Sequence, residues 1–127
     1  MKDPDTSNLD GILKGEILTQ LSGNVSPENV DAMAVKARRR FAPNALWTIV
    51  AVETEQIDIK ARARLKAIFE EFRLSGGTLL VAVTDKPGII TAFRMAAIQA
   101  NATLKPAKNR KEASELAIAH RAKRPKP

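Results

Sequence analysis

Hydrophobic and polar positions along the chain follow two periods, which alternate from one segment to the next. The segment "GEILTQLSGNV" alternates apolar and polar side chains, which predicts a strand that closes on a turn at Ser22-Gly23. The apolar runs "LWTIVAV" and "TLLVAV" predict strands that are covered on both faces. "ATLKPAKN" predicts a short strand, which Pro106 confines to an edge or an end because proline cannot donate to a strand ladder.

Helical spacing fills the segments between these strands. Ser26 predicts an N-cap and Pro27 the first position of a helix, whose buried stripe is Val30, Met33, Ala34, Ala37 and Phe41. A second helix is expected to begin at Asp58 and to end at Ser75-Gly76-Gly77. Its inward residues are Ala61, Leu65, Ile68, Phe69 and Phe72.

Two further helices complete the pattern. Asp85 predicts the cap of a third helix, whose inward residues are Ile89, Ile90, Phe93, Ala97 and Ala100. Residues 110–123 predict a last helix that buries Ala113, Leu116, Ile118 and Ala119, and the following "RPKP" cannot continue it. The alternation of strands and helices predicts a single α/β domain with a mixed, mostly parallel sheet of about four strands and with about four helices.

A chain of 127 residues is long enough for one hydrophobic core and short for two. We expect residues 1–10 to form a flexible N-terminus, residues 11–119 the folded domain and residues 120–127 a basic, flexible tail. The chain has no cysteine, its start lacks the apolar run of a secretory signal peptide, and no apolar run approaches the roughly 18–20 residues that cross a bilayer. We therefore expect a cytoplasmic protein.

The net charge of +7 is concentrated toward the end of the chain. Residues 104–127 hold eight Lys or Arg and two Asp or Glu, whereas residues 1–103 hold thirteen and twelve. A basic terminal segment on a nearly neutral body attracts nucleic acid or an anionic membrane surface over a long range. A terminus that only aids solubility is the alternative interpretation.

Residues that could support catalysis or bind a metal ion are sparse. Glu53, Glu55 and Asp58 form a carboxylate cluster, which we interpret as a solvated strand end and a helix cap because no second cluster accompanies it. The chain has no cysteine, no tyrosine and a single histidine, His120, so it offers no nucleophile paired with a base. Residues 84–88 follow a strand and open a helix but lack the spacing of a phosphate-binding loop. We expect no enzymatic activity, no cofactor and no metal site.

The order of the predicted elements, together with three short segments, resembles the STAS domain of anti-sigma factor antagonists. "ILTQLSGNVSPENVDAM" is similar to the family's opening strand, its Ser-Gly and its first helix. "GGTLLVAVTDKPGIITAFRMA" is similar to its Gly-started strand and third helix, and "LKPAKNRKEASELA" to its closing strand and helix. The resemblance extends over about residues 15–119 and implies a STAS-like fold and a role as a regulatory protein-protein interaction module.

The resemblance also points to one surface. In STAS domains the central strand is typically followed by Asp-Ser-Ser-Gly, where a Ser or Thr is the phosphorylated switch. Here Asp58 is followed by Ile59 and Lys60, which have no hydroxyl to accept phosphate. The resemblance therefore implies docking of a protein partner without phosphorylation at the usual site, through the "VETEQ" loop and the start of the second helix. The implied partner-binding residues are Glu55, Gln56, Asp58, Ile59, Lys60, Ala61 and Arg62.

A small nucleic-acid-binding accessory protein is the alternative function. Its phosphate contacts would come from the basic tail and from cations on the first two helices. The cations of the second helix alternate around it, which favours a solvated face over a phosphate-reading stripe. The candidate nucleic-acid-binding residues are Arg38, Arg39, Arg40, Arg64, Arg121, Lys123, Arg124 and Lys126.

Overall fold

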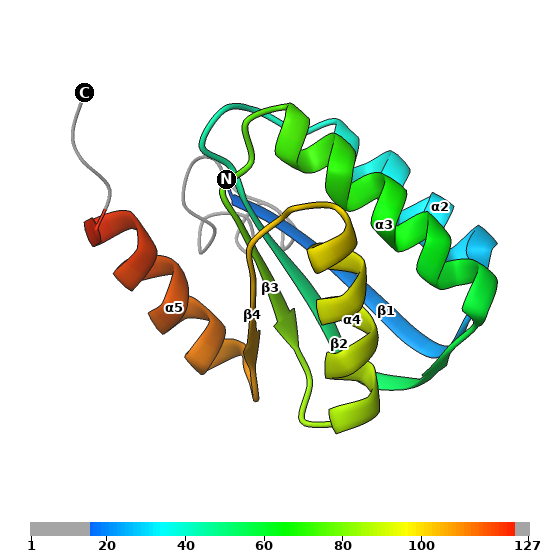
Figure 1. The fold of residues 1–127 in the computed structure, drawn as a ribbon. Helices are drawn as coiled ribbons and strands as arrows, with labels where there is room; N and C mark the ends of the chain where they lie inside the picture. The colour runs from blue at the N-terminus through cyan, green and yellow to red at the C-terminus, as the bar shows by residue number, and fades with distance from the viewer. Residues whose placement is uncertain (1–15, 124–127) are drawn as a thin grey trace, which may run out of the picture.

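A four-stranded sheet forms the middle layer of the protein (Figure 1). The structure, a computed structural model, describes residues 16–123. The strands lie side by side in their order along the chain, and every pairing among them is parallel. They are β1 (Glu16–Val25), β2 (Leu46–Ile57), β3 (Leu79–Val83) and β4 (Leu104–Ala107).

Helices cover both faces of the sheet, three on one side and one on the other (Figure 1). The chain steps from strand to strand in one direction, and right-handed crossovers then place all the connecting helices on the same face. These are α2 (Pro27–Arg38), α3 (Ile59–Leu74) and α4 (Pro87–Gln99). The last helix, α5 (Arg110–Lys123), packs on the opposite face, against β3 and β4. The prediction of a single α/β domain with four strands and four helices is confirmed.

An aromatic cluster lies between the sheet and the three connecting helices. The Trp47 side chain of β2 is buried, and its ring centroid lies 5.8 Å from that of Phe69 and 5.7 Å from that of Phe72, both on α3. The indole N–H of Trp47 donates a hydrogen bond to Thr19 Oγ1 at 2.9 Å. Because this buried polar group has a partner, the tryptophan can occupy the core without an unpaired donor.

Local sequence features, namely a capping residue, a proline and glycines, fix where α2 begins and where α3 ends. The Ser26 hydroxyl accepts a hydrogen bond from the N–H of Asn29, and Pro27 occupies the first turn of α2. The α3 helix ends at Leu74 with Ser75 as its C-cap, and the following Gly76 adopts φ +100°. A Cβ atom on Gly77 would lie 2.4 Å from the Phe72 ring. Any larger residue at position 77 would therefore clash with this ring. The predicted buried stripe of α3 is confirmed at every position.

The first two strands are longer than their apolar runs. The predicted turn at Ser22-Gly23 is wrong, because β1 passes through it with shifts in register and Gly23 at φ +66°. Residues 52–56, the "VETEQ" segment expected to be a loop, belong to β2. Only residues 46–50 of β2 pair with β3, so the ends of β1 and β2 form a two-stranded ribbon beyond it.

Two helices differ from the prediction in detail. Lys86 rather than Asp85 occupies the N-cap position of α4, and no side-chain capping bond forms there. The buried positions of α5 are Ala113 and Ala117 with Leu116 half-buried, whereas Ile118 is 61% exposed and Ala119 is also exposed. The buried stripe thus follows i, i+3, i+4 spacing from Ala113.

Residues 120–123 of the stretch assigned to a basic tail are helical, because α5 continues to Lys123. His120 Nε2 lies 3.2 Å from Thr78 Oγ1, and Arg121 Nε lies 3.4 Å from Glu16 Oε2. Residues 1–10 and 124–127 lie outside the described part of the chain. None of the described helices combines the length and apolar character that crossing a bilayer requires.

Candidate partner-binding surface

The predicted docking residues lie at one corner of the molecule, where β2 ends and α3 begins. Strand β2 ends at Ile57 and α3 starts at Ile59, so Asp58 alone connects them. Asp58 occupies the N-cap position, but its side chain makes no capping hydrogen bond. Its backbone N–H donates to Val25 O at 3.0 Å, and its carbonyl accepts from Arg62 N at 3.1 Å. The connection is therefore fixed by the backbone, and the Asp58 carboxylate is left at the surface.

Six of the seven implied partner-binding residues are exposed at this corner. They are Glu55, Gln56, Asp58, Ile59, Lys60 and Arg62. Ile59 is 79% exposed, which makes it the most exposed of the large hydrophobic side chains in the described part of the chain. Ala61 is 0% exposed because it belongs to the inward stripe of α3, so its assignment to a partner-binding surface is wrong.

Lys86 ties this corner to the start of α4. Its Nζ donates to the Thr54 carbonyl at 2.7 Å and lies 3.5 Å from Glu55 Oε2. The Lys86 N–H donates to Thr84 Oγ1 at 3.2 Å, which fixes the loop that carries the side chain. Residues 54 and 86 are far apart in the sequence and meet only through the parallel pairing of β2 and β3, so no local pattern indicates this contact.

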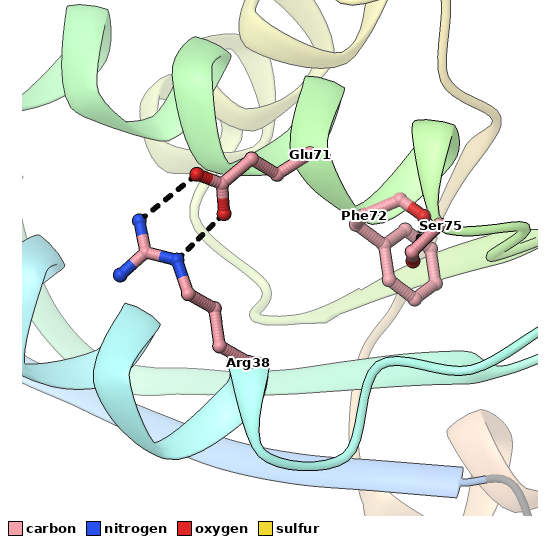
Figure 2. Close-up of polar contacts among 4 residues, drawn as sticks. All are labelled: Arg38, Glu71, Phe72 and Ser75. Carbon is pink, nitrogen blue, oxygen red and sulfur yellow. Dashed lines mark hydrogen bonds and ion pairs between the residues drawn. The ribbon is translucent and has the colours of Figure 1, made fainter.

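The hydroxyl groups of Thr54, beside the corner, and of Ser75, at the far end of α3, both make structural hydrogen bonds. Thr54 is 0% exposed, and its Oγ1 donates to Leu21 O at 3.1 Å across the ribbon. Ser75, at the opposite end of α3, donates to Phe72 O at 2.7 Å (Figure 2). A modifying enzyme would have to open the β1–β2 ribbon to reach the Thr54 hydroxyl.

The carboxylates of this region do not gather into a metal site. Within residues 16–123, no three or more His, Asp or Glu side chains lie close enough together to hold an ion. Glu55 instead pairs with Lys86, while Glu53 and Asp58 face solvent. Within the described residues, this corner therefore presents exposed charged side chains without a cluster of metal-binding groups.

The candidate nucleic-acid-binding cations are partly engaged with carboxylates. Arg38 of α2 forms a two-point ion pair with Glu71 of α3, with Nε–Oε2 at 2.6 Å and Nη2–Oε1 at 3.2 Å (Figure 2). Arg64 of α3 pairs with Asp31 of α2. The hydrogen bond to Glu71 raises the pKa of Arg38, and that to Asp31 raises the pKa of Arg64. Both side chains therefore stay charged, but each already has an anionic partner that links two helices.

The remaining candidate cations do not form one described surface. Arg39 and Arg40 are exposed at the end of α2, and Arg121 lies near Glu16. The Lys123 side chain, Arg124 and Lys126 fall outside the described part of the protein. The six exposed partner-binding residues lie between positions 55 and 62, whereas the described cations are spread over α2 and its end, α3 and α5.

Comparisons with protein-family models, with curated proteins and with solved structures found no match. The resemblance to the STAS domain accordingly rests on the order of the elements and on the three short segments of the sequence.

Proposed function

We propose that the protein is a non-enzymatic regulatory module with a STAS-like domain, and that it docks a protein partner through the β2–α3 corner. The observation that carries this proposal is Ile59. It is a large apolar side chain, 79% exposed, at the first position of α3 and on the surface where the resemblance places docking. A cytoplasmic location accompanies the proposal and is supported by the absence of cysteine.

The surroundings of Ile59 fit the usual composition of a protein interface. An apolar anchor that becomes buried on binding contributes much of the affinity, while charged residues at its rim set orientation and specificity. Lys60 and Arg62 supply positive charge and Glu55 and Asp58 negative charge around the anchor. Since Ile59 and Lys60 cannot accept phosphate, we infer that regulation does not use the usual STAS phosphorylation site.

The test is a comparison of Ile59→Asp with Leu74→Asp, which changes an equally apolar residue that is 70% exposed at the other end of the same helix. Partners are first captured from the native cell by a photo-crosslinker placed at Ile59 or at Leu74. The affinity of each purified variant for the captured partner is then measured by calorimetry. We expect Ile59→Asp to weaken binding by about tenfold or more and Leu74→Asp to leave it unchanged. Equal affinities for both variants would contradict the proposal.

Nucleic-acid binding is the second candidate and is favoured by the positive charge of residues 104–127. If Arg38 contacts phosphates, removing its partner should release it, so Glu71→Gln should raise the affinity for a DNA duplex. Glu70→Gln makes the same change of charge beside it and, within the described residues, removes no ion pair. Gel shifts at low and physiological salt on both variants and on a chain ending at Ala119 test this function. Binding that is insensitive to salt, or absent in all three, excludes it.

A further inference from the structure

A groove of about 450 Å³ runs along the outer edge of β1. Its walls include residues 18–22 of β1, Lys36 of α2, Val50 of β2 and Arg110 of α5. Successive residues of a strand point to opposite faces of the sheet, so five consecutive residues can line one groove only where it follows the strand edge. The groove therefore passes around the edge of the sheet, from the α2 side to the α5 side.

The two edges of the sheet differ in how well they are protected against pairing. Strand β4 has four residues, and they include Lys105 and Pro106, both of which discourage addition of another strand. Strand β1 has ten residues and contains neither lysine nor proline. In the described part of the protein β1 pairs only with β2, so its other side offers backbone N–H and C=O groups to the groove.

The positively charged side chains of the groove favour an occupant that carries negative charge. Lys36 and Arg110 lie on opposite sides of the sheet, and no Asp or Glu lines the groove. Within the described residues neither cation forms an ion pair. The half-buried side chains of Leu18 and Val50 add an apolar surface on the α5 side. An extended segment with both acidic and apolar side chains complements these features.

We propose that the free edge of β1 receives an extended acidic segment of a protein partner, which adds to the sheet as a further strand. Backbone hydrogen bonds would supply affinity, and carboxylates directed to the two faces would contact Lys36 and Arg110. This surface is separate from the β2–α3 corner, and the inference does not depend on the function proposed for that corner.

A blocked peptide, acetyl-Val-Glu-Glu-Val-Glu-Glu-Val-amide, serves as the probe because it places carboxylates on both faces of an extended strand. Binding to the full-length, 15N-labelled protein is followed by NMR. We expect amide shifts and slowed hydrogen exchange concentrated in residues 18–22. The double variant Lys36→Glu/Arg110→Glu should weaken binding by about tenfold, since two charge pairs are lost and repulsion is added. The control Lys105→Glu/Arg94→Glu makes the same change of charge at other exposed positions and should bind as the wild type does.

Two altered probes separate strand addition from general attraction between charges. A peptide methylated on every backbone nitrogen keeps every carboxylate but loses the N–H donors of both strand edges, and it should not bind. A peptide with lysine in place of glutamate should also fail. Equal binding of the methylated peptide, equal loss of affinity in both double variants, or absence of binding by the first peptide would each overturn the proposal. Displacement of the peptide by a single-stranded oligonucleotide at physiological salt would assign the groove to nucleic acid and would overturn it as well.

Discussion

The hydrogen bond between Trp47 and Thr19 is the polar contact on which the aromatic core depends. Thr19→Val removes the acceptor with little change in shape and leaves the buried indole N–H unpaired. We expect the free energy of unfolding to fall by about 1–3 kcal/mol. Urea denaturation measures this loss, and Thr48→Val, a half-buried neighbour without a side-chain hydrogen bond in the described structure, should change it by less than about 0.5 kcal/mol. Equal losses of unfolding free energy in the two variants would contradict a stabilising role for the Trp47–Thr19 hydrogen bond.

For individual residues, the burial of side chains could be predicted from the sequence, but contacts between residues far apart in the sequence could not. The inward residues of α2 and α3 follow from helical spacing, and Trp47 is buried as its apolar run indicates. The same spacing conflicts with the assignment of Ala61 to a binding surface, which came from the resemblance alone. The Lys86–Thr54 and Arg38–Glu71 contacts depend on strand register and helix packing, so no local pattern encodes them.

The start of α5 depends on a reciprocal cap. Asn109 Oδ1 accepts from the N–H of Glu112 at 2.8 Å, and Glu112 Oε1 accepts from the N–H of Lys108 at 3.1 Å. Replacing Asn109 with alanine should lower the free energy of unfolding by about 1 kcal/mol, because a helix N–H loses its partner. Thermal or urea denaturation checks this value. Ser114→Ala, an exposed position on the same helix, is the control and should stay within about 0.5 kcal/mol of the wild type.

The lengths of β1 and β2 are the main difference between the predicted and the observed elements. The charged residues Glu53 and Glu55 predict a loop, yet they occupy outward positions of a strand. The buried positions of this part of the strand are Thr54 and Ile57. Irregular register in β1 breaks the strict alternation that marks a strand in sequence. Pairing between the two strands therefore extends both of them where neither would be recognised alone.

Across the whole molecule, the two faces of the sheet differ in how much apolar surface they bury. All residues of β3 are buried, whereas among the described side chains of α5 only Ala113 and Ala117 are fully buried. We expect native-state hydrogen exchange to be slowest in β3 and, among the helices, fastest in α5. Exchange of α5 amides as slow as those of α3 would instead show that the two faces unfold as one unit.

The strand order has a consequence for how the chain acquires its structure. Within residues 16–123, each strand pairs only with the strands next to it in the sequence, from which it is separated by one helix and its loops. No pairing in this sheet joins strands that are distant in the sequence. The entropy lost in closing the loop between two paired strands is therefore modest. During synthesis the β1–α2–β2 unit can therefore assemble before β4 leaves the ribosome. The nascent sheet would grow by one strand at a time. Each strand that leaves the ribosome would pair with the strand synthesised just before it.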